Sequence, residues 1–271
     1  MILLAVALQL ATASCEQALT DARSASERRA FSDAAKAFER ALSLCPNRAA
    51  ILLPLAQTRI LLGDEQSAES HLQEALTLAP RDSAALYSLG RLYYSQGRYP
   101  EAVTHLSRLV ELEPNNYRAH DNLALCYDLL QQDALALKHY FRALDLVKDA
   151  HHDYDWAYAN TAEFFLKRDQ FEKAFQLAAE AAARNPQSAR NAYLTGTALV
   201  KLHRDEQSLR WLARAVELDP SHAEARFQLG HAFRRLGRNA DAQLHLDAFK
   251  ALKARAASTR DLPRGVELRA P

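Results

Sequence analysis

Several patterns that build enzyme sites are missing from this sequence. The 271 residues include only seven glycines, and none forms the G-x-G-x-x-G or G-x-x-x-x-G-K pattern that cradles a phosphate. The three cysteines form no C-x-x-C pair, and no H-E-x-x-H pattern is present. His151, His152, Asp153 and Asp155 are neighbours in one polar segment, where adjacent histidines are more often simply solvated. With no nucleophile placed beside a base, we expect no enzymatic activity, no metal site and no cofactor.

The chain also lacks an excess of charge of either sign. Thirty-four Lys and Arg residues oppose 33 Asp and Glu residues, which leaves a formal net charge of +1. No overall field would therefore draw the chain to nucleic acid or to a membrane surface. Ala and Leu dominate instead, and both lose little entropy in a helix, so the composition favours helices.

An internal repeat appears in the spacing of the prolines. Pro46, Pro80 and Pro114 are 34 residues apart, and so are Pro186 and Pro220. The interval between Pro114 and Pro186 is 72 residues, which equals two periods plus an insertion of four residues at about 151–154. Seven repeats follow from this phase, and they start near residues 15, 49, 83, 117, 155, 189 and 223.

Each repeat has the pattern of two amphipathic helices joined by a tight turn. Position 8 of every repeat is Ala or Gly, and position 20 is Ala or Ser, as is needed where two helices cross closely. Gly97 and Gly237 suit the left-handed conformation that ends a helix. Pro54 is an exception, because it falls within the first helix of the second repeat and predicts a late start or a kink there.

These features resemble the tetratricopeptide-repeat (TPR) family over residues 15–254. The third repeat carries the family motif nearly in full, with Leu89, Gly90, Tyr93, Gly97, Tyr99, Ala102 and Pro114. The resemblance implies an all-α fold, a right-handed superhelical solenoid of about seven helix-turn-helix repeats. One helix pair cannot bury its apolar face alone, so stacked neighbours share a continuous core. Residues 256–271, rich in Arg, Pro and small residues, are expected to form a disordered tail.

The first 13 residues, MILLAVALQLATA, are apolar and uncharged. They are too short to span a bilayer and resemble the hydrophobic region of a signal peptide, with Ala11-Thr12-Ala13 as the cleavage site. The basic residues that usually precede such a region are absent. We therefore expect a periplasmic or secreted protein without a transmembrane segment in the mature chain. The alternatives are an N-terminal helix packed on the first repeat of a cytoplasmic protein, and a lipid attached to Cys15.

Two cysteines lie at one end of the first predicted helix pair. Cys15 and Cys45 are positions 1 and 31 of the first repeat, and the start of one helix lies beside the end of the other in an antiparallel pair. We expect a disulfide between them, which agrees with export because disulfides persist in oxidising compartments. Cys126 falls on a predicted core face and is expected to be a small buried hydrophobic residue.

The resemblance also implies a concave groove lined by the first helix of each repeat, which would bind a protein or peptide partner. Aromatic and Arg side chains anchor partners, and Asn122 and Asn160 could hold an extended backbone. A slight cationic excess favours a segment with carboxylates. The function expected is a non-enzymatic scaffold, with a cytosolic TPR adaptor or co-chaperone-like assembly factor as the alternative and weak self-association through terminal repeats. The groove residues are Tyr87, Arg91, Tyr94, Arg118, Asn122, Trp156, Asn160, Lys167, Arg190, Tyr193, Lys201, Phe227, His231 and Arg234.

Overall fold

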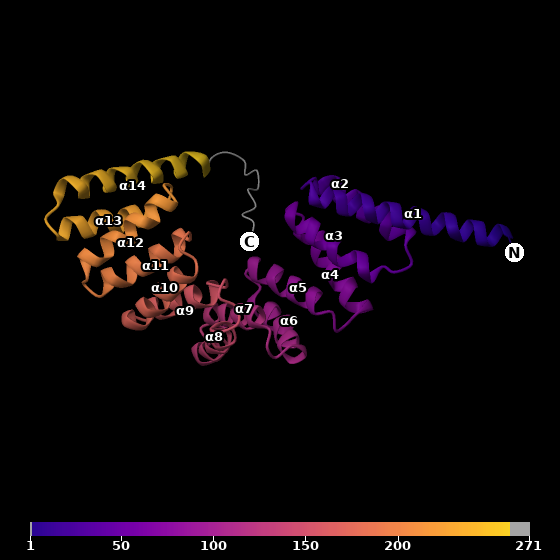
Figure 1. The fold of residues 1–271 in the computed structure, drawn as a ribbon, viewed down its shortest axis with the longest axis horizontal. Coiled ribbons are helices and arrows are strands. Elements are labelled where there is room, and N and C mark those ends of the chain that lie inside the picture. The colour runs from indigo at the N-terminus through magenta and orange to yellow at the C-terminus, as the bar shows by residue number, and fades with distance from the viewer. Residues whose placement is uncertain (1, 261–271) are drawn as a thin grey trace. The chain divides into compact units, whose positions relative to one another are not determined.

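The computed structural model describes residues 2–260, which contain fourteen helices joined by short turns and, within that range, no strand (Figure 1). This confirms the predicted all-α fold of about seven helix pairs. In chain order the helices are α1 (Ile2–Glu27), α2 (Phe31–Leu44), α3 (Ala49–Leu61), α4 (Glu65–Leu78), α5 (Ser83–Ser95), α6 (Tyr99–Leu112), α7 (Tyr117–Leu129), α8 (Asp133–Val147), α9 (Trp156–Leu166), α10 (Phe171–Arg184), α11 (Ala189–Lys201), α12 (Asp205–Leu218), α13 (Ala223–Arg235) and α14 (Asn239–Arg260).

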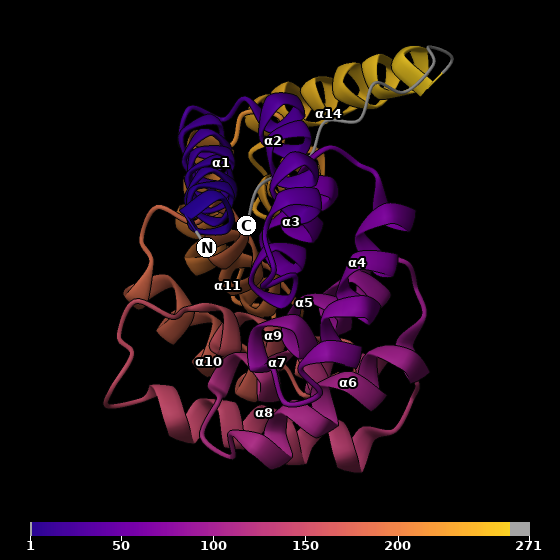
Figure 2. The same cartoon turned by 90° about the vertical axis from the view of Figure 1, so that its right-hand side faces the viewer.

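The helices form two compact units, of which the first holds α1 to α7 and the second holds α8 to α14. Within the first unit, α1 packs on α2, α3 on α4 and α5 on α6, and each pair packs on the first helix of the next repeat. Figure 2 shows α1, α2 and α3 side by side in this unit. The second unit repeats the pattern from α9 with α10 to α13 with α14. Each unit is thus a stack of helix pairs around a shared core.

Close helix crossings explain the small residue at position 8. Gly90 lies in α5 beside Leu106 of α6, and a Cβ atom on Gly90 would come within 2.6 Å of the Leu106 Cγ. Gly196 has the same relation to Leu212, at 2.7 Å. Contacts this short cannot be tolerated in a packed core. The small residues predicted from the repeat therefore set the approach of the two helices of a pair.

The turn within each repeat places one residue in the left-handed conformation. The predicted glycines, Gly97 and Gly237, both have φ of 75°. The other five repeats use the same backbone at the same position, although four of them have no glycine there. These residues are Arg29 (58°), Gly63 (76°), Gln131 (59°), Asp169 (56°) and His203 (58°).

Replacing one of these non-glycine residues should stabilise the protein. A side chain with a Cβ is strained at positive φ, whereas glycine is not, so His203→Gly is expected to raise the free energy of unfolding by about 1 kcal/mol. Urea denaturation of the full chain measures the change. The matched control is Gly237→Ala, which should lower stability by a similar amount. A His203→Gly protein that is no more stable than the wild type would contradict this account of the turn.

The expectation of a late start at Pro54 is wrong. Helix α3 begins at Ala49 and continues through the proline to Leu61. Thr58, one turn later, donates a hydrogen bond from its hydroxyl to the Pro54 carbonyl at 2.8 Å. Because Pro54 is only the sixth residue of α3, its missing N–H removes one backbone hydrogen bond near the start of the helix.

The last helix is longer than the other second helices, with 22 residues against 14 in α12. Helix α14 continues to Arg260, so residues 256–260 are helical and not part of a disordered tail, while 261–271 lie outside the described residues. In α6, Val103 and Val110 pack against the core that α6 shares with α7. The equivalent residues of α14 are Gln243 and Lys250, and both are exposed. Helix α14 therefore carries polar side chains at the two positions where α6 has valines that pack against its neighbour.

Two histidines at the same repeat position are half-buried against aromatic rings. The His105 ring lies 5.5 Å from the Tyr93 ring, and the His245 ring stacks 5.6 Å from the Phe233 ring, measured between centroids. The Nδ1 atom of each histidine is buried and has no hydrogen-bond partner among the described residues. Burial lowers the pKa of both imidazoles; Arg108 lowers the pKa of His105 further, and for His245 Arg226 lowers it while Asp241 opposes the shift.

Acid should therefore weaken the fold. Because the pKa of His105 and of His245 is lower in the folded than in the unfolded chain, the unfolded chain binds more protons below an ordinary histidine pKa of about 6.5. The stability present above that pH is lost as the pH falls from there through the folded-state pKa. Thermal unfolding between pH 7.5 and pH 5 should show a falling Tm, and a His105→Leu, His245→Leu variant should show a smaller fall. Equal slopes for the two proteins would show that these histidines are not the cause.

Candidate peptide-binding groove

The predicted groove residues all lie on first helices or at their ends, but they fall in two separate stretches. The first stretch belongs to the first unit, with Tyr87, Arg91 and Tyr94 on α5 and Arg118 and Asn122 on α7. The second belongs to the second unit and involves α9, α11 and α13. Its members are Trp156, Asn160, Lys167, Arg190, Tyr193, Lys201, Phe227, His231 and Arg234.

Asn122 links the two helices of the first stretch. Its Nδ2 donates to the Tyr87 hydroxyl at 3.3 Å and to the Arg118 carbonyl oxygen at 2.8 Å. The guanidinium of Arg91 lies over the Tyr87 ring, 5.8 Å from its centroid. Burial raises the pKa of Tyr87, so its hydroxyl stays protonated near neutral pH. Since both amide hydrogens of Asn122 are used within the protein, its Oδ1 is the atom suited to accept from a bound peptide.

Arg190 is the centre of the second stretch. Its Nη2 donates to Asn160 Oδ1 at 2.8 Å and to Glu163 Oε2 at 2.9 Å, and its guanidinium lies over the Trp156 ring at 5.2 Å. Lys167 is 3.5 Å from the same carboxylate. Burial alone would raise the pKa of Glu163, but the hydrogen bond and charge of Arg190 bring it below its ordinary value. Arg190 is therefore held in place beside an exposed aromatic ring.

This network changes the role expected for Asn160. The sequence suggested that Asn160 would meet a peptide backbone, yet the side chain is buried and its Oδ1 accepts from Arg190. Asn160 thus supports Arg190, and the exposed partner of the pair is the arginine, whose side chain is 33% exposed. Sequence spacing could not show this, because the two residues are 30 positions apart in different repeats.

Aromatic side chains continue the second stretch onto α11 and α13. The Tyr193 hydroxyl accepts a hydrogen bond from Gln228 Nε2 at 3.1 Å. Gln228 was not among the groove residues predicted from the sequence. The Phe227 ring lies 4.3 Å from the His231 ring, and Arg234 Nη2 is 2.7 Å from His231 Nδ1. Burial lowers the pKa of His231, with Arg234 and Arg235 adding to the effect, so the neutral imidazole can accept from Arg234.

Two of these aromatic rings remain open to solvent. Trp156 is 50% exposed and Phe227 is 42% exposed, although large apolar side chains are usually buried. Both lie beside cationic groups, Arg190 in the first case and Arg234, through His231, in the second. Exposed aromatic rings next to arginines are the residue types that most often anchor a protein partner.

A buried polar pair holds the segment around the four-residue insertion. Asp155 and Asn191 are both buried, and the Asp155 carboxylate accepts from Asn191 Nδ2 at 2.5 Å and from Asn185 Nδ2 at 3.4 Å. Arg184 donates to the carbonyl oxygens of Val147 and His151 at 3.3 and 3.2 Å. Asp155 is thus a structural residue, which its position within a polar run did not reveal.

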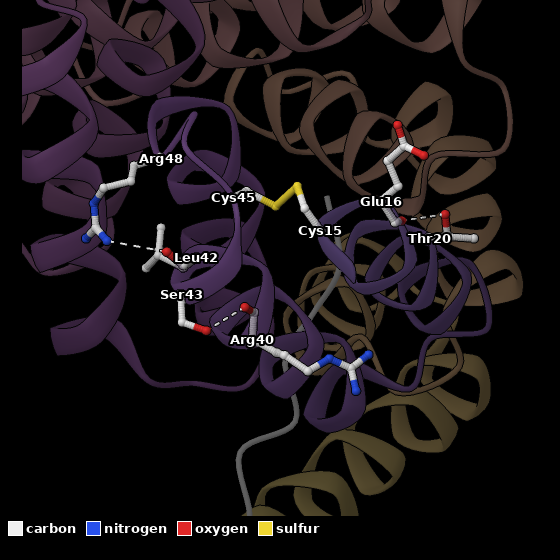
Figure 3. Close-up of a disulfide and its surroundings, with 8 residues drawn as sticks. All are labelled: Cys15, Glu16, Thr20, Arg40, Leu42, Ser43, Cys45 and Arg48. Carbon is white, nitrogen blue, oxygen red and sulfur yellow. Dashed lines mark hydrogen bonds between the residues drawn. A yellow bond between two sulfur atoms is a disulfide. The ribbon is translucent and has the colours of Figure 1, made fainter. Parts of the chain in front are cut away.

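The first helix pair is closed by a disulfide. Cys15 of α1 and Cys45, the residue after α2, are joined with an S–S distance of 2.08 Å and a Cα–Cα distance of 5.1 Å (Figure 3). Cys45 is part of a buried cluster with Ala18, Ala41 and Ile51. The remaining cysteine, Cys126, is buried, and burial raises the pKa of its thiol to about 12.

Helix pairs stacked around a shared core define a helical-repeat protein. Profiles described as "Tetratricopeptide repeat" match residues 61–126 in one case and residues 19–83 and 193–258 in another. The chain belongs to the tetratricopeptide repeat family, whose fold supports a role as a protein-interaction scaffold. Among the helices of residues 2–260, none combines the length and apolar character needed to cross a bilayer.

Solved structures share the fold at low sequence identity. A tetratricopeptide repeat protein from Parabacteroides merdae is 14% identical, with 88% of this chain and 93% of that chain covered and a TM-score of 0.70. PilF of Pseudomonas aeruginosa is 20% identical, with 79% and 96% covered and a TM-score of 0.66. YrrB, described as a TPR protein with an unusual peptide-binding site, is 21% identical, with 70% and 96% covered and a TM-score of 0.53. No curated protein matches the sequence of this chain.

Proposed function

We propose that this protein is a non-enzymatic scaffold whose first helices bind an extended segment of a partner protein. The observation that carries the proposal is the arrangement around Arg190, which is fixed by Asn160 and Glu163 and lies beside the half-exposed Trp156. A preorganised arginine loses little entropy when it binds, because its side chain is already ordered. An exposed tryptophan adjacent to it supplies apolar area for an anchoring side chain.

The charges of the second stretch favour an acidic partner segment. Lys201 and Arg234 are exposed cations, and Lys167 and Arg190 share the single carboxylate of Glu163. The other nearby acid, Glu224, is already paired with Lys253 at 2.8 Å. Arginine binds carboxylates through paired hydrogen bonds, so we expect the segment to carry Asp or Glu together with a large apolar side chain.

Site-specific photo-crosslinking tests this proposal. A benzophenone amino acid placed at Trp156 or at Phe227 should capture the same partner in cells, because both positions line the second stretch. The matched control is Leu244, which is 67% exposed but lies on the second helix of its repeat. Adding Arg190→Ala should reduce the crosslinked yield about tenfold or more if it removes an anchoring contact. Capture from Leu244 alone, or equal capture from all three positions, would contradict the proposal.

We further propose that the protein is exported and that residues 1–13 are removed. Helix α1 has 26 residues, whereas α3, α5, α7, α11 and α13 have 13 each. Cleavage after Ala13 would leave 14 helical residues from Ser14 to Glu27, one more than in those helices. Residues 12–14 are exposed, and Cys15 is partly buried against the core of the first helix pair. The bridge between Cys15 and Cys45 suits an oxidising compartment.

The intact mass of the protein, expressed with its N-terminal segment and kept without reductant, tests export. A mass that lacks residues 1–13 and rises by two daltons on reduction would support processing and the bridge. An unprocessed chain with three free thiols would overturn the export proposal. That outcome would favour the cytosolic adaptor, in which residues 2–14 remain part of α1.

A further inference from the structure

The second unit has a hollow that does not belong to the predicted groove. It has a volume of about 680 Å³ and lies between the second helices α10 and α12, whereas the groove residues lie on first helices. Its floor includes Ala192 of α11. Its lining residues include Ala182, Ala192, Arg210, Trp211, Arg214 and Glu217.

One of the residues that line the hollow is small where three other repeats have a large residue. Ala182 is position 28 of its repeat, and the same position is Leu42, Leu76 or Leu144 in three other repeats. Leu76 is buried in the core of the first unit, so a leucine at this position normally fills the space between neighbouring repeats. With alanine there, the space is left open beside the ring of Trp211.

Three charged side chains line the hollow, Arg210, Arg214 and Glu217. Arg210 is exposed, and its guanidinium lies 5.3 Å from the centroid of the Trp211 ring. Arg214 is bound to Glu217 at 3.0 Å and to Gln187 at 3.3 Å. Within the described part of the chain, Arg210 has no carboxylate partner. Alanines and a tryptophan thus line the hollow together with charged side chains, a combination of apolar and charged groups that protein interfaces also contain.

We propose that this hollow is a second docking site, which takes a partner segment with one large apolar side chain and a neighbouring carboxylate. The apolar side chain fills the space left by Ala182 and contacts Trp211, and the carboxylate pairs with Arg210. The two arginines and one glutamate that line the hollow give a net positive charge, so acidic segments are favoured over basic ones. The site shares helix α11 with the groove, but its side chains are different and most of them belong to α10 and α12.

Peptide display on the full-length protein tests this site without knowledge of the partner. A library of random twelve-residue peptides is selected on the wild type and depleted on Ala182→Leu, which fills the hollow with the residue that other repeats use. Selected peptides are labelled and their affinities measured by fluorescence polarisation. Ala182→Leu should fold with an unchanged or higher Tm, because it removes a void. Ala213→Glu, an exposed substitution at the same hollow, is the second variant if Ala182→Leu proves unstable.

The expected result is a set of peptides with one large apolar residue beside Asp or Glu. Their affinity should fall at least tenfold with Ala182→Leu or Ala213→Glu and severalfold with Arg210→Ala, the latter most at low salt. The groove variant Arg190→Ala should keep the affinity of these peptides. The proposal is overturned if no peptide is enriched, if the enriched peptides are basic, or if they bind the filled and the open protein equally. Loss of binding with Arg190→Ala alone would assign the peptides to the groove and also overturn it.

Discussion

Reduction of the Cys15–Cys45 bridge is expected to lower the free energy of unfolding by about 3–4 kcal/mol. The bridge closes a loop of 30 residues, and restricting a loop of this size in the unfolded chain has an entropic effect of about that magnitude. Helix α1 has α2 as its main packing partner, so the bridge also holds a terminal helix that has few other contacts. Urea denaturation with and without a reductant measures the difference.

The matched control is the Cys15→Ala, Cys45→Ala protein, which should be less stable than the oxidised wild type and insensitive to reductant. Cys126 should not interfere, because its thiol is buried and its high pKa keeps it protonated. Hydrogen exchange should show the loss of protection concentrated in α1 and α2. A wild-type protein that unfolds at the same urea concentration with and without reductant would show that the bridge does not stabilise the fold.

Asn191→Leu is expected to destabilise the second unit by about 2–4 kcal/mol. The substitution removes the 2.5 Å hydrogen bond to the buried Asp155 carboxylate and the 3.0 Å bond to the Ala181 carbonyl oxygen. When a buried acceptor has no donor, the free-energy cost of its desolvation is no longer offset by a hydrogen bond, and this cost is largest for a charged group. Urea and thermal denaturation of the full chain measure the effect.

Two further variants separate the loss of this hydrogen bond from a packing defect. Asn185→Ala removes only the 3.4 Å contact with Asp155 and should cost under about 1 kcal/mol. Asp155→Leu combined with Asn191→Leu replaces both partners by apolar groups and should recover much of the lost stability. If the double variant is as unstable as the single one, steric crowding at Asn191 and not the orphaned carboxylate is the cause.

The repeat period accounts for most of the fold that could be predicted. Prolines at a spacing of 34 residues and small residues at position 8 fix where each helix pair begins and where its helices cross, and these are local properties of the sequence. The pairing of Cys15 with Cys45 followed from the same phase, because antiparallel helices bring positions 1 and 31 together. Gly97 and Gly237 were recognisable because glycine favours positive φ.

Features that depend on neighbouring repeats could not be predicted in this way. Arg190 reaches Asn160 across 30 residues and Asn191 reaches Asp155 across 36, and no motif marks either pair. The left-handed turns at Asp169 and His203 were also missed, since only glycine is a strong sequence signal for this backbone. The start of α3 before Pro54 also depends on tertiary packing, because the contact of α3 with α4 outweighs the cost of one lost backbone hydrogen bond.

Two polar residues on α14, Gln243 and Lys250, limit how the repeat array could be lengthened by duplication of a helix pair. Repeat arrays lengthen when a duplicated unit finds an apolar neighbour, but a helix pair added after Arg260 would meet an amide and an ammonium group at Gln243 and Lys250 in place of two valines. The added helix pair would therefore pack poorly against α14. Lengthening at this end therefore needs at least two further substitutions at the same time, and head-to-tail polymers through this end are disfavoured for the same reason.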